Sequence, residues 1–156
     1  ARFYREAEER TTWQILRKRA QLGHLFCYYY YPLHHKTLPY YDMFPMIMLL
    51  KAEKETFLGI NFHYLRPKWR AILLDRVHAR IGAAIPKWNK IRQIRQLAPT
   101  IKRYRYDHIM KRIIAIKEDE REIAIFLPTE RFKKTSKQKV WTDSERKFGV
   151  SKGRFG

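Results

Sequence analysis

The sequence predicts an α+β fold: a small antiparallel sheet or a partly open β-barrel, three to four helices and a basic C-terminal tail. Two strand-like segments, 46–51 and 57–65, flank a short polar loop, which is typical of a β-hairpin. Helical spacing of apolar residues begins after Pro67. Because a sheet of four or five short strands must close or cover its edges, we expect it to curl or to be covered by helices.

The N-terminal third combines one predicted helix with aromatic strands. Residues 1–22 have apolar side chains at roughly helical spacing, and Gly23 is a stop signal, so we expect an amphipathic helix. Segment 24–31 is rich in aromatic residues and is followed by a proline, which predicts a strand. The three prolines of 32–45 predict an ordered loop that leads into the hairpin.

Prolines also divide the second half of the chain. Helices are predicted for 67–82 and 87–97, a further turn for 99–106, and a second pair of strands for 109–117 and 121–127. The remainder is basic and contains a short predicted helix over 140–147. We therefore expect three regions: an N-terminal amphipathic helix over 1–23, an α+β core domain over 24–130 and a basic C-terminal tail over 131–156.

The charge balance is the strongest indication of function. The chain has 34 Lys and Arg against 15 Asp and Glu, which gives a formal net charge of +19. A compact domain with that charge repels itself, so we expect a polyanionic partner such as a nucleic acid or an acidic protein surface. The longest apolar run, 46–50, is far shorter than the roughly 20 residues of a membrane-spanning helix, so we expect no membrane partner.

The sequence contains no convincing catalytic or metal-binding pattern. Its six histidines lack the i, i+4 spacing of a helical zinc site, and Cys27 is the single cysteine. Asp143, Glu145 and Lys147 weakly resemble the Glu-x-Lys core of some nucleases, but no matching carboxylate lies upstream. We therefore expect no enzyme activity, no metal, no cofactor and no small-molecule substrate.

Two basic regions form the predicted polyanion-binding surface. Segment 84–112 interleaves cations with aromatic rings, as proteins that bind single-stranded nucleic acid do. The basic tail would contact phosphates without reading sequence. The alternative interpretation is a solvated, charged face. The candidate residues are Lys87, Lys90, Arg92, Arg95, Lys102, Arg103, Tyr104, Arg105, Tyr106, Lys111, Arg112, Lys133, Lys134, Lys137 and Lys139.

The aromatic segment 26–44 has two interpretations. Tyr28 and Tyr30 would share one face of a strand, and the tyrosines between and after them the other. Such a strand is either buried in the core or part of a protein interface, where tyrosine is enriched. The candidate protein-interface residues are Trp13, Tyr28, Tyr30, Tyr40 and Tyr41.

Four motifs together resemble a known family. They are LPYYD-x-FP at 38–45, a strand motif ending in HYL at 57–65, Arg-Ala-x-Leu-Leu-Asp at 70–75, and the segment 123–128. This combination resembles small basic proteins of contractile-tailed bacteriophages, the DNA end protectors, over roughly 26–145. The resemblance implies a non-enzymatic virion protein on the ends of the packaged genome, and it supplies no catalytic residues.

The favoured hypothesis is therefore a phage virion protein that binds DNA ends through its basic regions. Its partners would be phage genomic DNA and other virion proteins in a larger assembly, within the virion and, during assembly, the host cytoplasm. The alternative is a structural subunit of the phage neck, tail or baseplate that acts through protein–protein contacts. A nuclease and an intracellular RNA-binding protein are weaker alternatives.

Overall fold

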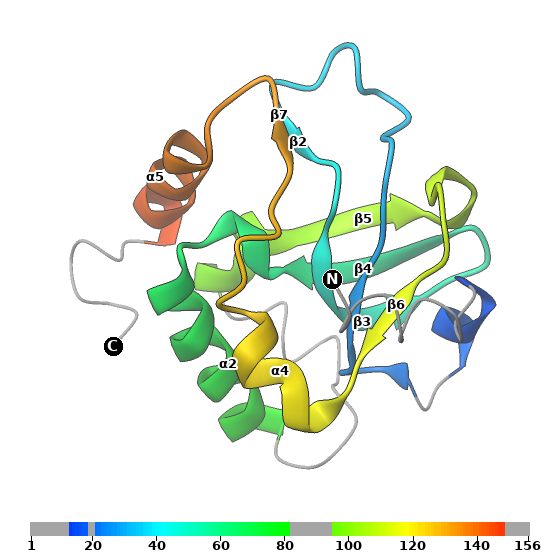
Figure 1. Ribbon diagram of the computed structural model, residues 1–156, viewed down its shortest axis with the longest axis horizontal. Coiled ribbons are helices and arrows are strands. Elements are labelled where there is room, and N and C mark those ends of the chain that lie inside the picture. Colours follow the sequence, from blue (N-terminus) through cyan, green and yellow to red (C-terminus); the bar gives the residue numbers. More distant parts are fainter. Residues whose placement is uncertain (1–12, 19–20, 82–94, 149–156) are drawn as a thin grey trace.

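A five-stranded antiparallel sheet forms the centre of the protein (Figure 1). The computed structural model describes residues 13–18, 21–81 and 95–148. The strand order is β5-β4-β3-β1-β6, and the sheet is open rather than closed into a barrel, so the predicted α+β class is confirmed. Its strands are β1 (Leu25–Cys27), β3 (Met46–Ala52), β4 (Thr56–Asn61), β5 (Ile101–Arg105) and β6 (Ile114–Ile116).

The β3–β4 hairpin is the centre of the sheet and confirms the predicted hairpin, but its second strand is shorter than the predicted 57–65, because Phe62–Tyr64 form a 3-10 helix. Its register shifts between Leu49 and Lys51, where an irregularity interrupts the pairing. Gly59 lies opposite Leu49. A Cβ atom at position 59 would lie only 2.8 Å from the Ile47 Cβ atom. Gly59, which belongs to the 57–65 strand motif, therefore lets the Ile47 side chain pack directly on the β4 backbone.

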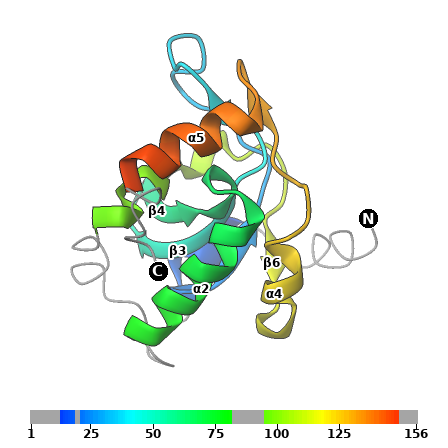
Figure 2. The same ribbon diagram turned by 90° about the vertical axis from the view of Figure 1, so that its left-hand side faces the viewer.

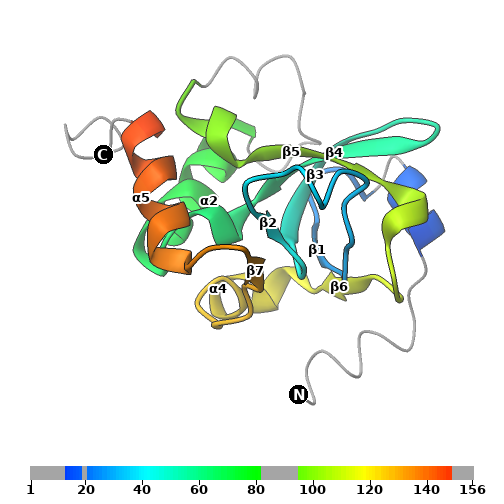
Figure 3. The same ribbon diagram turned by 90° about the horizontal axis from the view of Figure 1, so that it is seen from above.

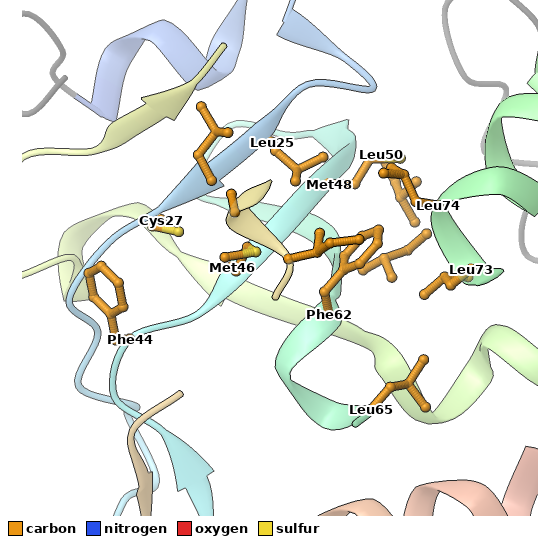
Figure 4. Packing of buried hydrophobic residues seen from close by; sticks show 14 of the residues in the cluster. Leu25, Cys27, Phe44, Met46, Met48, Leu50, Phe62, Leu65, Leu73 and Leu74 are labelled. Carbon is orange, nitrogen blue, oxygen red and sulfur yellow. The ribbon is translucent and has the colours of Figure 1, made fainter. Parts of the chain in front are cut away.

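The sheet is buried on both faces, because alternate residues of its strands enter two separate hydrophobic clusters. Met46, Met48 and Leu50 of β3 point into the first cluster, which the helices cover (Figure 4). Ile47 and Leu49 point into the second, which is rich in aromatic rings. The rings of that second cluster are Phe26, Tyr28, Tyr30, Phe57, Tyr104 and Tyr106.

Three α-helices are described, and two of them close the first cluster. α2 (Pro67–Ile81) contributes Leu73 and Leu74, and α4 (Arg121–Ala124) contributes Ala124. In Figure 2, α2 lies in front of the sheet, with α4 beside it and α5 (Lys137–Phe148) above it. The helices predicted for 67–82 and 140–147 are confirmed. Among the described helices, none is both long enough and apolar enough to cross a membrane.

The predicted strand over 121–127 is wrong, because this segment contains the short helix α4. Arg121, Ala124 and Ile125 are buried, and their i, i+3, i+4 spacing is helical rather than alternating. Ile123 and Phe126 are exposed. The edge of the sheet is occupied instead by β6, which pairs with β1 and is shorter than the strand predicted over 109–117.

The turn predicted from Pro99 through Tyr106 is also wrong. Pro99 lies inside a 3-10 helix, Arg95–Thr100, and the residues after it form the edge strand β5. Each of the five β5 residues pairs with β4. This strand was missed because its Lys and Arg side chains hide the period-2 pattern that buried strands show.

The predicted N-terminal helix lies mostly outside the described residues. Trp13–Arg17 form a short 3-10 helix, and Leu16 packs into the second cluster. The predicted strand over 24–31 is reduced to β1, after which Tyr30 makes an isolated bridge to Ile109. The boundaries of the three predicted regions remain a prediction.

Candidate nucleic-acid interface

The aspartate of the LPYYD motif is the centre of a buried polar network. Asp42 is 4% exposed and accepts hydrogen bonds from the backbone N–H groups of Phe44 (3.0 Å) and Arg131 (3.1 Å). It also accepts from Asn61 Nδ2 at 3.1 Å, and its Oδ2 atom lies 2.8 Å from His63 Nδ1. Asp42 therefore fixes the end of the 32–45 loop against β4 and the segment before β7 (Phe132–Lys133).

The charge of Asp42 is stabilised by these partners. Burial by itself raises the pKa of the Asp42 carboxyl, but the His63 ring and the N–H groups of Phe44 and Asn61 outweigh burial and hold the pKa below its ordinary value. An ionised carboxylate can accept all four hydrogen bonds at once. The LPYYD motif is thus a structural one.

The same network contains a Thr–His–Asp chain that resembles a nucleophile–base–acid arrangement. His63 Nε2 lies 2.9 Å from Thr129 Oγ1, on the side of the ring opposite Asp42. The His63 side chain is completely buried, so a substrate does not reach the ring in this structure. The chain is therefore explained by packing: it joins the 3-10 helix Phe62–Tyr64, directly after β4, to the segment between α4 and β7.

A second buried network joins the helices. Arg70 is fully buried and donates to the carbonyl oxygens of Leu65 (2.6 Å) and Ile125 (2.9 Å). Its third partner is the Glu130 carboxylate at 3.0 Å, which also lies 3.3 Å from Lys137 Nζ at the start of α5. The arginine of the 70–75 motif thus ties α2, α4 and α5 together, and its role is structural as well.

The Asp42 network borders a pocket between the 30–42 segment and β5, which we call the loop–β5 pocket. β2 (Tyr41–Asp42) ends the loop and pairs with β7 (Phe132–Lys133) in a two-stranded sheet. In Figure 3 the loop lies between β5 and β7. The pocket has a volume of about 590 Å³. Its lining includes Tyr30, His34, Tyr40, Tyr41, Tyr64, Lys102, Arg103, Tyr104 and Arg105.

The cations of β5 have partners of their own. Lys102 Nζ lies 4.2 Å from the centroid of the Tyr64 ring, a cation–π contact. Arg103 pairs with Glu53 at 2.7 Å, and Arg105 pairs with Asp107 at 3.0 Å. Both ion pairs are solvent-exposed, so they exchange for a phosphate at little cost in free energy.

Lys134 holds the loop in place. Its Nζ atom donates to the carbonyl oxygens of His35, Lys36 (3.2 Å) and Leu38 (2.9 Å). Its φ of 73° lies in the left-handed region, which costs a non-glycine residue energy. Three hydrogen bonds from one ammonium group offset that strain. The main role of the Lys134 ammonium group is therefore to hold the loop backbone.

The structure brings together candidate residues that lie far apart in the sequence. Lys102, Arg103 and Arg105 from the first basic region, and Lys134 from the tail, surround a loop that carries the candidate interface residues Tyr40 and Tyr41. Lys133 is the register partner of Tyr41. Lys137 and Lys139 lie on α5, and Lys111 Nζ lies 4.9 Å from the Tyr29 ring centroid. Arg112 is exposed before β6.

Other candidate residues lie mostly in the core. Tyr28, Tyr30, Tyr104 and Tyr106 are buried in the second hydrophobic cluster, where their rings pack against aromatic neighbours. Tyr30 and Tyr104 also line the loop–β5 pocket, whereas Tyr28 and Tyr106 do not. Lys87, Lys90 and Arg92, and the side chains of Trp13 and Arg95, lie outside the described residues.

The carboxylates of the weaker nuclease hypothesis have structural partners. Glu145 forms a two-pronged ion pair with Arg66. Asp143 lies near the Tyr40 hydroxyl, and burial together with the Asp143 carboxylate raises the pKa of Tyr40. The Lys147 side chain lies outside the described residues. Within the part of the chain that the structure describes, no three His, Cys, Asp or Glu side chains gather as metal ligands would.

The fold and the surface define a class of protein: a small, basic α+β protein whose cations gather around a tyrosine-lined pocket. The family model described as phage T4 terminal DNA protecting protein matches residues 12–144, which is most of the chain. The chain therefore belongs to this family, and the resemblance seen in its motifs is confirmed. No curated protein and no solved structure matches it.

Proposed function

We propose that this protein is a non-enzymatic virion protein that binds the ends of phage DNA through the loop–β5 pocket and the cations around it. The observation that carries the proposal is the convergence of three β5 cations with the tyrosine-bearing loop. Cations supply sequence-independent affinity for phosphates, and aromatic rings supply stacking surfaces for bases. Family membership supports DNA as the partner.

Loss of two β5 cations is expected to weaken DNA binding specifically. Arg103→Gln/Arg105→Gln removes two exposed positive charges and releases Glu53 and Asp107 as repulsive carboxylates. The slope of log K against log salt concentration should fall by about 2, because each lost phosphate contact on duplex DNA contributes about 0.9. Fluorescence anisotropy with a labelled linear duplex, measured over a salt series, gives this slope.

The matched control changes the net charge equally at another place. Lys68 is on α2 and Lys117 follows β6 at the opposite edge of the sheet; both are exposed. Lys68→Gln/Lys117→Gln should leave the slope nearly unchanged. An equal loss in both double variants would show that binding follows net charge alone and would refute this surface.

End binding also requires that linear DNA competes better than a covalently closed circle of the same sequence.

A structural role in the phage neck, tail or baseplate is a second candidate, which exposed apolar side chains favour. Leu33, Met110 and Tyr31 are 53%, 58% and 41% exposed. Backbone hydrogen bonds from Met110 to Tyr29 and from Tyr31 to His108 bring their two segments side by side. Exposed apolar clusters of this kind often contact another protein.

Copy number in purified particles separates these two roles. A DNA-end protein should be present at about one or two copies per genome, whereas a ring subunit should be present at six, twelve or more. Quantitative mass spectrometry of intact particles, scaled to the major capsid protein, makes this measurement. A symmetric multiple would favour the structural role over end binding.

A further inference from the structure

We propose that the loop–β5 pocket holds an unpaired nucleotide at the end of a DNA duplex, with the base among the tyrosines and the phosphate beside the β5 cations. This inference rests on the proposed function and adds a preference for a frayed or single-stranded end. It concerns the ligand of the pocket, which neither charge nor family membership specifies.

The dimensions of the pocket indicate the size of the ligand. A volume of about 590 Å³ lies within the range of sites that bury small ligands of nucleotide size. A duplex does not enter a pocket of this volume, but a strand end that has left its partner strand does. Duplex DNA would therefore lie outside, against the exposed cations, while one terminal nucleotide occupies the pocket.

The lining matches the two halves of a nucleotide. Tyr40, Tyr41 and Tyr64 supply aromatic rings, and Tyr40 and Tyr41 are only partly buried, so their side chains are accessible from the pocket. A base stacks on such rings whatever its identity. Lys102 and Arg103 lie along the same pocket and provide the positive charge that a phosphate requires.

The pocket is held in shape before any ligand arrives. Lys134 fixes the loop backbone by donating to three carbonyl oxygens of the loop. The β2–β7 pairing fixes the backbone of Tyr41. Because these groups are already ordered, the protein loses little conformational entropy when a ligand binds, as expected of a preorganised binding site.

The first test varies the DNA and leaves the protein unchanged. Blunt duplexes and duplexes with one, two or three unpaired nucleotides at either end are compared at one salt concentration. One unpaired nucleotide should tighten binding by about tenfold, since stacking of one base contributes roughly this much. A 2-aminopurine at the unpaired position should lose fluorescence on binding. Equal affinities for blunt and overhanging ends would overturn this inference and leave end binding itself intact.

The second test removes the ring. Tyr40→Leu should abolish the preference for the overhang while retaining affinity for blunt duplex. The matched control is Phe126→Leu, a ring just after α4 that is 52% exposed and outside the pocket lining. If Tyr40→Leu is unstable, Lys102→Gln gives the same readout. A preserved overhang preference in both pocket variants overturns the assignment to this pocket, and absence of any DNA binding overturns the proposed function as well.

Discussion

Arg70→Met is expected to destabilise the protein by about 3–5 kcal/mol, because it leaves the Glu130 carboxylate without its buried partner. Arg70 is completely buried and makes three hydrogen bonds, to Leu65, Ile125 and Glu130. Its replacement also leaves two carbonyl oxygens without donors. The measurement is the free energy of unfolding, obtained from a urea titration that is monitored by circular dichroism.

Lys137→Met provides the matched control, because Lys137 contacts the same carboxylate from the surface. Its side chain is 41% exposed, and its Nζ atom lies 3.3 Å from Glu130 Oε1. Loss of an exposed pair costs about 0–1 kcal/mol. Similar costs for the two variants would contradict the view that Arg70 ties α2, α4 and α5 together. In the double variant Arg70→Met/Glu130→Met the cost should be lower than the sum of the single ones, since no buried charge remains.

The fold class and the central hairpin could be predicted from local sequence signals. The β3–β4 hairpin has apolar strands and a polar tip, and α2 begins at Pro67, so both features appear within short windows of sequence. β5 and α4 could not be predicted in this way. β5 is an exposed edge strand whose cations mask alternation, and the helical burial of Ala124 and Ile125 depends on α2 across the cluster.

The candidate site was only half predictable for a related reason. Charge and aromatic content predicted which residue types would form a candidate site, but the convergence of β5 with the 32–45 loop is a tertiary contact. The burial of Tyr104 was invisible for the same reason: it alternates with exposed cations in the sequence, and only the pairing with Phe57 of β4 places it in the core. The LPYYD motif marked the loop, and its aspartate fixes that loop through buried hydrogen bonds.

That aspartate leads to the second large effect. Asp42→Ala is expected to cost about 3–5 kcal/mol, because it leaves four donors without an acceptor in a buried site. Asp42→Asn keeps the shape and one acceptor oxygen, so its cost should be smaller. Thermal and urea unfolding of both variants checks this order. Equal stability of the alanine variant and the wild type would show that the loop is held by other contacts.

The pH dependence of stability gives an independent test of the same carboxylate. The pKa of Asp42 is lowered in the folded protein from its ordinary value of 3.8, so its stabilising contribution is complete above that value and is lost as the pH falls through the lower folded value. Between about pH 6 and pH 2, Asp42→Asn should therefore lose less stability than the wild type. Asp107→Asn is the control, because the Asp107 carboxyl also has a lowered pKa but is exposed, where solvent weakens its pair with Arg105. If the acid sensitivity of stability depends on Asp42 and not on Asp107, the loop–β5 pocket depends on this buried network. The affinity for overhanging DNA ends should then also fall in acid, as the stability does.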